Sequence, residues 1–287
     1  MKIAVLADIH ANFRALQAVG EHVDRWRPDA VWVAGDTVNR GPCSPACLDY
    51  IQARQRAQGW RVIRGNHEDY IINQSQPDIP KSGPTYEMLR PIHWTVAQLA
   101  GRIPELATLP EQISQRFAEA GEVRMVHASM RGNRVGIYPE STEEELRRLV
   151  APAPAVILVG HTHRPLVRNL DHPRGKTLVV NAGSVGLPFD GDTRTGYAQL
   201  TIHQGEWQAR MVRLPYDLDL AQRDYLTSGF LQGGGPLVKL ILLELDSALS
   251  QLYQWVGRYS QEIEQGCMTV SEAVEDFLKT PISQPYW

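Results

Sequence analysis

Seven side chains that can bind a metal ion lie between residues 8 and 163, each just beyond a short apolar run. They are Asp8, His10, Asp36, Asn66, His127, His161 and His163. A set of carboxylate, amide oxygen and imidazole ligands favours manganese, iron or zinc over calcium or magnesium. Seven ligands are too many for one ion that must keep an open coordination position. The set therefore suits two ions that share a bridging carboxylate.

Short apolar runs predict the strands that position these ligands. Buried strands are expected at Ile3–Leu6, Ala30–Val33, Trp60–Ile63, Val123–Val126, Ala155–Val159 and Thr177–Val180. Helical spacing between them covers Phe13–Trp26, capped by Asn12, and a second helix from Ser44, interpreted as its N-cap, to Gln58. This alternation predicts a largely parallel sheet covered by helices, where ligands bind beyond the carboxyl ends of the strands.

The middle of the chain departs from this alternation. Residues 73–120 hold several prolines and predict a helical insertion between core strands. Ser141 and Glu144 have the spacing of a capping box at the start of another helix. Tyr197–Ile202 is expected to pair with Trp207–Val212 as a hairpin.

The sequence changes character again after Leu214. The glycines at 233–235 predict a flexible break, residues 237–256 have continuous helical spacing, and Thr269 with Glu272 suggests one more capped helix. We therefore expect a core domain over residues 1–214 and a helical extension over residues 215–287. The apolar stripe of the extension is expected to serve core packing or homo-oligomer contacts.

The motifs around the seven side chains share their order with a known family. They are Asp8-x-His10, Gly35-Asp36, Gly65-Asn66-His67-Glu68, His127 and Gly160-His161-Thr162-His163. Together they resemble the calcineurin-like metallophosphoesterase superfamily, in its bacterial branch near the protein phosphatases and diadenosine tetraphosphatases. The resemblance implies an α/β fold, specifically a four-layer α-β-β-α sandwich with its site at one sheet edge.

The resemblance also implies a division of the metal ligands. Asp8, His10 and His163 would hold one divalent ion, and Asp36 would bridge to the other. Asn66, His127 and His161 would complete the second ion. Manganese or iron is expected first, with zinc, nickel or cobalt as alternatives. The implied reaction is hydrolysis of a phosphoester, in which a hydroxide that bridges two metals attacks phosphorus in line with the leaving group.

Three further residues match or depart from the phosphatase pattern. His67 corresponds to the histidine beside the leaving-group oxygen, where it can donate a proton. Arg40 matches a phosphate-gripping arginine, although an exposed loop charge is the alternative. Asn39 stands where the phosphatases have aspartate, and an amide cannot stabilise an imidazolium by charge. We expect Asn66, His67 and Arg40 to contact the substrate. We also expect a preference for esters whose leaving group needs little acid assistance, such as aryl esters.

Each ligand has an ordinary explanation when it is taken alone. Asp8 could cap a turn, Gly35-Asp36 is a common turn pair, and Asn66 could cap a helix. His161 and His163 could form an exposed pair on one strand face. Their joint occurrence in family order favours the metal site.

Other polar residues are given ordinary interpretations. His22, His93, His172 and His203 match no ligand position. Arg124, Arg131 and Arg134 are interpreted as surface charges rather than substrate contacts. Glu68 is interpreted as an acid that stabilises the start of a helix rather than as a partner of the ligands. Trp94 could line the pocket, with core packing as an equal alternative, and the segment 181–186 is expected to shape the pocket.

Composition narrows the possible partners. A formal net charge of −3 and 43% apolar residues describe a globular chain, with no basic stripe that would favour nucleic acid. No apolar run reaches the length needed to cross a membrane, and no signal peptide is evident, so a cytoplasmic location is expected. The three cysteines are interpreted as ordinary thiols.

Three functions remain open from the sequence. The first is hydrolysis of a phosphomonoester or phosphodiester, with a small molecule or a phosphoprotein as the substrate. The second is a non-catalytic scaffold of the same fold, which the intact ligand set disfavours. The third is nucleic-acid processing, which the acidic net charge disfavours.

Overall fold

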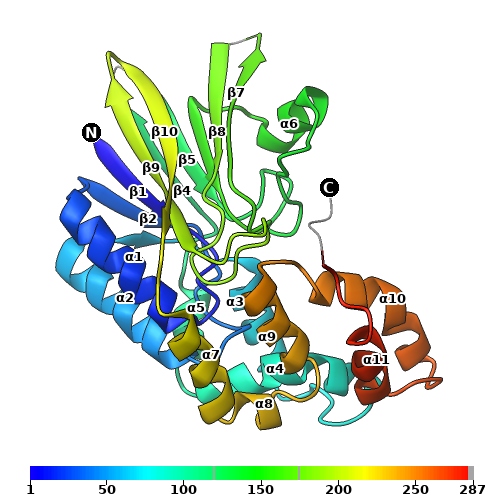
Figure 1. Ribbon diagram of the computed structural model, residues 1–287. Helices are drawn as coiled ribbons and strands as arrows, with labels where there is room; N and C mark the ends of the chain where they lie inside the picture. Colours follow the sequence, from blue (N-terminus) through cyan, green and yellow to red (C-terminus); the bar gives the residue numbers. More distant parts are fainter. Residues whose placement is uncertain (119, 174, 284–287) are drawn as a thin grey trace.

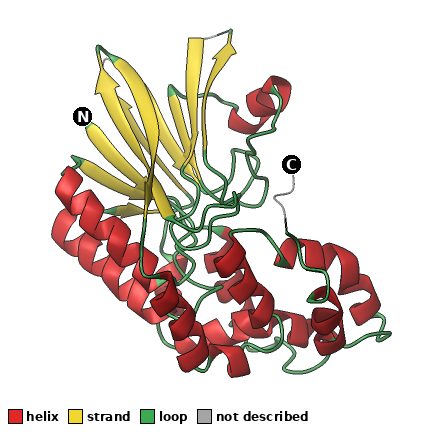
Figure 2. Cartoon of the chain, in the orientation of Figure 1, coloured by secondary structure: helices red, strands yellow, loops and turns green. Residues whose placement is uncertain are grey.

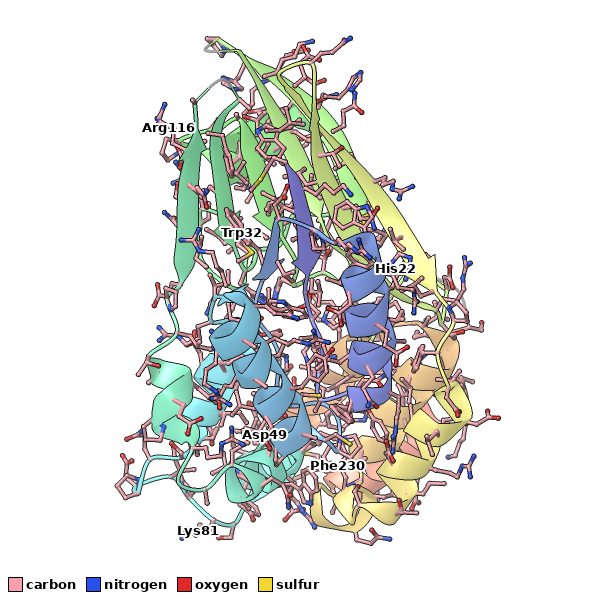
Figure 3. All side chains as sticks on the ribbon, turned by 90° about the vertical axis from the view of Figure 1, so that its left-hand side faces the viewer. His22, Trp32, Asp49, Lys81, Arg116 and Phe230 are labelled. Atoms are coloured by element: carbon pink, nitrogen blue, oxygen red, sulfur yellow. The ribbon has the colours of Figure 1, made fainter. Side chains whose placement is uncertain are left out.

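Two five-stranded sheets form the upper part of the molecule in Figures 1 and 2, with helices on their outer faces and further helices below them. The computed structural model describes residues 1–118, 120–173 and 175–283. Apolar side chains of both sheets meet between them, including Val5 from one sheet and Met125 and Leu158 from the other. Trp32, labelled in Figure 3, belongs to the same cluster. Separate apolar clusters join each outer face to helices. The four-layer α-β-β-α arrangement is therefore confirmed.

The first sheet has the strand order β10-β9-β1-β2-β3. Its strands are β1 (Lys2–Leu6), β2 (Ala30–Val33), β3 (Arg61–Val62), β9 (Thr195–His203) and β10 (Glu206–Leu214). Strands β1, β2 and β3 run parallel, and β9 pairs antiparallel with β1 and β10. The predicted parallel core and the β9–β10 hairpin are both confirmed.

The second sheet has the order β4-β5-β6-β8-β7. Its strands are β4 (Gln112–Phe117), β5 (Gly121–Val126), β6 (Val156–Val159), β7 (Leu166–His172) and β8 (Gly175–Asn181). The central three are parallel, while β4 and β7 add antiparallel edges. The prediction of a helical insertion as far as residue 120 is wrong at its end, because β4 lies there. Residue 119 of that insertion lies outside the described residues.

Helices cover the sheets much as the sequence predicts. These helices are α1 (Phe13–Trp26), α2 (Ser44–Gln58) and α6 (Glu143–Val150). The Asn12 side chain accepts the Ala15 N–H at 3.0 Å, as expected for the cap of α1. Two predicted caps are wrong by one residue: Cys43 precedes α2, and Thr142 forms the capping box of α6 with Glu145.

The insertion supplies α3 (Asn66–Gln74), α4 (Pro84–Gln98) and α5 (Ile103–Ala107). The chain after β10 forms α7 (Leu218–Thr227), α8 (Phe230–Gly233), α9 (Val238–Ser247), α10 (Leu252–Glu264) and α11 (Val270–Phe277). This second group packs against α4 below the sheets in Figure 1. Thr269 and Glu272 form the predicted capping box of α11.

Two features of the extension differ from prediction. Gly233 and Gly234 sit against Trp94 and Phe230 so closely that a Cβ would clash, so the glycines make a tight turn rather than a flexible break. The continuous helix expected over residues 237–256 is broken at Ala248, whose φ is 53°. Residues 284–287 of the predicted extension lie outside the described residues. The domain boundary and self-association through these helices stay predictions.

Within the described ranges, no helix combines the length and apolar content that a membrane crossing requires.

Candidate metal centre

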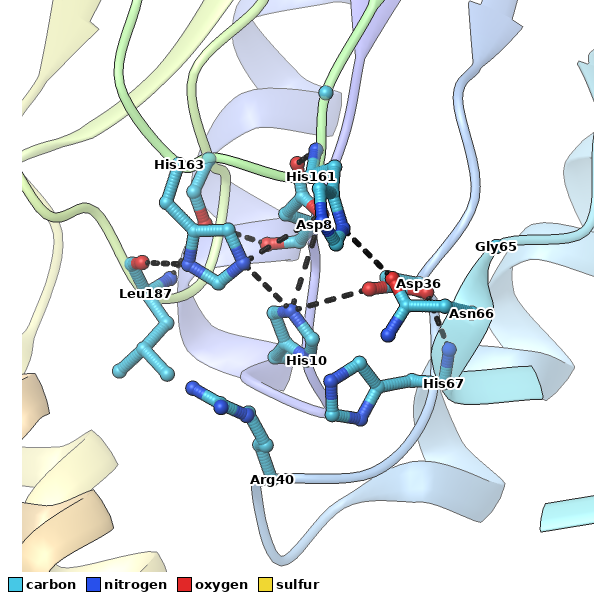
Figure 4. A network of polar contacts seen from close by, with 12 residues as sticks. Asp8, His10, Asp36, Arg40, Gly65, Asn66, His67, His161, His163 and Leu187 are labelled. Atoms are coloured by element: carbon cyan, nitrogen blue, oxygen red, sulfur yellow. Dashed lines mark hydrogen bonds and ion pairs between the residues drawn. The ribbon is translucent and has the colours of Figure 1, made fainter. Parts of the chain in front are cut away.

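The seven predicted ligands converge at the carboxyl ends of the parallel strands. Figure 4 shows Asp8, His10, Asp36, Asn66, His161 and His163 together, and His127 contacts Asn66 and Asp36. Asp8 and His10 follow β1, Asp36 follows β2, and Asn66 opens α3 beyond β3. His127 follows β5, and His161 with His163 follows β6. The ligands are buried apart from His161, which is partly exposed. The sequence prediction that these positions meet at one edge is confirmed as a matter of geometry.

The loops at this edge pack without space between them. A Cβ on Gly65 would lie 2.1 Å from Asp36 Oδ1, and one on Gly160 would lie 2.4 Å from Asp8 Oδ2. Glycine is therefore required at both positions for the backbone to approach the two carboxylates. The Asp8 carboxylate is fixed further by the His161 N–H, which donates to Oδ2 at 2.8 Å.

One group of ligand atoms gathers around Asp8. His10 Nε2 lies 2.9 Å from His163 Nε2 and 3.9 Å from Asp8 Oδ1. Asp8 Oδ1 lies 3.6 Å from His163 Nε2 and is buried, with no hydrogen-bond partner in the described part of the chain. His163 Nδ1 lies 2.5 Å from the Leu187 carbonyl, which directs Nε2 toward the group.

A second group gathers around Asn66. Its Oδ1 lies 2.8 Å from both His127 Nε2 and His161 Nδ1. His127 Nδ1 lies 2.7 Å from the Ala34 carbonyl, so its Nε2 faces the group.

Asp36 stands between the two groups. Its Oδ2 lies 3.3 Å from His127 Nε2 and 3.6 Å from His10 Nε2. Ligand atoms on one ion with bonds of about 2.1 Å are roughly 3.0–3.4 Å apart. The distances from Asp36 Oδ2 to the two histidines are close to this range. In the first group, Asp8 Oδ1 has no hydrogen-bond partner among the described residues. The residues therefore fit divalent metal binding.

Burial and neighbouring charges shift the pKa values of the ligands in different directions. Burial raises the pKa of Asp8 well above its ordinary value. Burial also lowers the pKa of His10 and His163, which keeps both imidazoles neutral and able to bind a metal. Burial opposes ionisation of Asp36, but the facing His127 holds the pKa of Asp36 well below its usual range. At His127 burial acts to lower the pKa, but the charge of Asp36 outweighs it and raises the pKa to about 10.

Glu68 has a larger part in the site than the sequence indicated. It is fully buried, and its two oxygens accept four backbone N–H groups. Oε2 takes those of Gly65 and Asp36 at 2.8 and 2.9 Å, and Oε1 takes those of Thr37 and Val38 at 2.7 and 3.3 Å. The interpretation of Glu68 as only a helix-stabilising acid is wrong. Its place in the Gly65-to-Glu68 motif was the signal for this role.

His67 lies beside both ligand groups and is held by Asn39. The Asn39 side-chain nitrogen lies 2.8 Å from His67 Nδ1. The backbone N–H of His67 donates to Asp36 Oδ1 at 2.8 Å. The His67 ring meets the His10 ring edge-on, with 4.7 Å between centroids. Burial, with the Arg40 charge, lowers the pKa of His67 to about 3 despite Asp36. His67, His10 and Asp36 also have ligand atoms within 4.8 Å of one another, so His67 is a possible ligand by distance.

Arg40 directs its guanidinium toward His163 and His10 from below the cluster (Figure 4). Its charge contributes to the lowered pKa of His10, His67 and His163. Nη1 contacts Glu244 Oε2 at 3.2 Å, so Arg40 is not the exposed loop charge of the alternative interpretation. No sequence signal pointed to Glu244.

The remaining candidates take several positions, and some of them contact the backbone of the ligand loops. Trp94 packs against Phe230, as expected for a core residue. Arg124 is held by Glu122 and the Pro152 carbonyl and does not face the cluster. The segment 181–186 supports the site from behind: Asn181 Nδ2 donates to the Gly160 carbonyl at 2.9 Å.

Comparison with known proteins identifies the family. The calcineurin-like phosphoesterase superfamily domain matches residues 1–205. The chain belongs to this superfamily.

Two relatives share sequence with this chain. An uncharacterized protein of Methanocaldococcus jannaschii is 25% identical over 76% of this chain and 89% of its own length. A symmetrical bis(5'-nucleosyl)-tetraphosphatase of Chromohalobacter salexigens is 39% identical over 70 residues, which cover 24% of each chain.

Solved structures show the same fold. A metallophosphoesterase from Sphaerobacter thermophilus superposes with a TM-score of 0.66 at 25% identity, over 87% of this chain and all (100%) of that one. A hypothetical protein of Pyrococcus horikoshii has a TM-score of 0.69 at 19% identity, over 83% of this chain and 97% of that one. The family and the first of these neighbours are phosphoesterases, which act on phosphoester bonds.

Proposed function

We propose that this protein is a phosphoester hydrolase that uses two divalent metal ions. The observation that carries the proposal is the position of Asp36 Oδ2, 3.3 Å from His127 Nε2 and 3.6 Å from His10 Nε2. A carboxylate between two separate groups of nitrogen and oxygen ligands is the arrangement that two metals sharing one bridge require.

The proposed ligand sets follow the two groups. One ion takes Asp8, His10 and His163, and Asp36 is shared. The other ion takes Asn66, His127 and His161. When bound, the two ions, proposed to be manganese or iron, would supply Lewis acidity for water and for the phosphoryl group.

The chain's own groups would handle the leaving group and the phosphate. We propose that His67 donates a hydrogen bond to the leaving-group oxygen, with Asn39 fixing its ring through Nδ1. The lowered pKa of His67, to about 3, supports a neutral imidazole in this role. A neutral donor suits leaving groups that need little acid assistance, such as aryl alcohols.

Arg40 is the proposed contact to the phosphate oxygens. Its guanidinium faces the ligand groups, and arginine holds phosphate through several parallel N–H donors. A cation at this place favours a substrate with a terminal, doubly charged phosphate. We therefore place phosphomonoesters, on small molecules or on proteins, ahead of diesters.

A substrate panel tests the proposal. The protein is loaded with Mn²⁺, the bound metal is measured by elemental analysis, and rates are compared for 4-nitrophenyl phosphate, bis(4-nitrophenyl) phosphate, a dinucleoside tetraphosphate and a phosphopeptide. We expect two ions per chain and hydrolysis that disappears with EDTA. Two bound ions with no hydrolysis of any compound would instead identify a scaffold of this fold.

A further inference from the structure

Glu244 is a buried acidic residue that contacts the proposed active site at Arg40. It lies outside the part of the chain that matches the family domain. It lies on α9, is fully buried, and its Oε2 contacts Arg40 Nη1 at 3.2 Å. The family domain ends at residue 205, so this contact belongs to the C-terminal helices. A carboxylate removed from water is unfavourable unless it is paired, and Arg40 is its pairing charge.

The other oxygen of Glu244 is committed to backbone. Oε1 accepts the N–H groups of Gln251 and Leu252, at 2.9 and 2.8 Å, where α10 begins. Burial raises the pKa of Glu244, while Arg40 and these two N–H groups favour its charged form. Because one oxygen is anchored to the start of α10, the other has a fixed position from which to hold Arg40.

A second helix of the extension holds the backbone of Arg40. The Tyr225 hydroxyl, on α7, donates to the Arg40 carbonyl at 2.8 Å. Tyr225 is 1% exposed, so this hydrogen bond is shielded from water. The Arg40 φ of 62° is a left-handed conformation that most side chains disfavour, and tertiary contacts must maintain it.

The contact with Glu244 leaves part of the guanidinium available. Arg40 Nε is buried and has no hydrogen-bond partner among the described residues. The guanidinium also lies 6.0 Å from the Phe189 ring centroid, and Phe189 stacks on His163. Arg40 is thus held along one edge, while its other donors lie on the side of the ligand groups (Figure 4).

We propose that Glu244 and Tyr225 are positioning residues that preorganise Arg40 for the substrate phosphate. The C-terminal helices then complete the substrate site rather than only covering the domain. This inference rests on the proposed function, because it takes Arg40 as the phosphate contact. Preorganised donors bind an anion more tightly because less side-chain freedom is lost on binding.

The test compares Glu244→Gln with Asp246→Asn, using Mn²⁺-loaded protein and 4-nitrophenyl phosphate. Asp246 lies on the same helix, is exposed, and contacts Gln222 rather than Arg40, so its change removes the same charge without touching the site. We expect Glu244→Gln to raise KM and the inhibition constant of inorganic phosphate about 5–10-fold, with kcat and metal content nearly unchanged. Asp246→Asn should leave all four quantities as they are.

A double-mutant cycle shows whether the effect passes through Arg40. In an Arg40→Ala background, Glu244→Gln should raise KM no further. An unchanged or lowered KM in Glu244→Gln, or an equal rise without Arg40, overturns the inference.

Tyr225→Phe provides an independent variant in case Glu244→Gln does not fold. It removes only the hydroxyl and should raise KM in the same direction by about 2–3-fold; no rise in KM would overturn the inference. If wild-type protein with bound Mn²⁺ hydrolyses no substrate, the proposed function itself fails. If wild-type protein hydrolyses the ester but both variants keep its KM, only the positioning role fails.

Discussion

Two fully buried glutamates support the proposed active site, and they do so through different contacts. Glu68, within the family domain, gives both oxygens to backbone N–H groups of the turn that carries Asp36. Glu244, in the C-terminal helices, gives one oxygen to backbone and the other to the Arg40 side chain. Burial raises the pKa of both, to about 7 at Glu68.

The difference separates two kinds of control over the reaction. Glu68 fixes the backbone at Asp36, so the region around it should govern metal binding and kcat. Glu244 fixes a side chain that is proposed to contact the substrate, so its region should govern KM. The following substitutions test the roles given to Glu68, Asp36 and the residues around them. They are ordered from the largest expected effect to the smallest.

Asp36→Asn should have the largest effect. Loss of the carboxylate between the two ligand groups should lower kcat on the order of 10³-fold and reduce the metal bound per chain. The readouts are hydrolysis of 4-nitrophenyl phosphate and elemental analysis, with Asp246→Asn as the charge-matched control. Two retained ions and a normal kcat would show that Asp36 is not a bridge.

His67→Asn should lower kcat for alkyl phosphates roughly 10²-fold, and less for aryl phosphates, because a donor to the leaving group is lost. The metal content should stay the same, although His67 is close enough to His10 and Asp36 to be a ligand. Loss of one ion would therefore assign His67 to the metal. His22→Gln, at a histidine bonded to Tyr197, is the control.

Glu68→Gln should weaken metal binding about 10–100-fold, because the turn at Asp36 loses its support. The amide nitrogen of glutamine would face two backbone N–H groups in place of an acceptor, which should lower the free energy of unfolding by about 3 kcal/mol. Calorimetric Mn²⁺ titration and urea denaturation measure the two effects. Glu244→Gln is the matched change in the other region, and equal losses of metal affinity in both would abolish the distinction drawn above.

Asn39→Asp should have the smallest effect. A carboxylate beside His67 Nδ1 would favour the protonated ring, so hydrolysis of alkyl esters should gain a few-fold over aryl esters, about 1 kcal/mol in the barrier. The ratio of kcat values for the two ester types measures this gain. Asn169→Asp, on an exposed part of β7, is the control, and an unchanged ratio removes the role given to Asn39.

The ligand edge could be predicted from sequence because two local signals coincided there. Central strands such as β1, β2 and β6 are continuous apolar runs, and a polar ligand follows each run at once. Parallel strands bring such positions together regardless of their separation in the chain.

Edge strands and tertiary partners gave no such signal. In β4 and β7 buried and exposed residues mix, because the edges of the sheet are partly open to water, and neither was predicted. Glu68 lies within a ligand motif, but its hydrogen bonds to the turn at Asp36 exist only once that turn has folded over it. Glu244 lies within an ordinary apolar helical pattern, and its partner is 204 positions away.

The left-handed backbone of the ligand loops has a consequence for local motion. Asp8, His10, Asp36, His161 and His163 all have positive φ, between 47° and 70°. Non-glycine residues in this conformation are destabilised by roughly 1 kcal/mol or more each. These turns should therefore open at a lower free energy than the sheets beneath them, and a cation that binds only the closed form should close them. Amide hydrogen exchange in the turns would then report ion binding residue by residue, while exchange in β1 and β6 stayed constant.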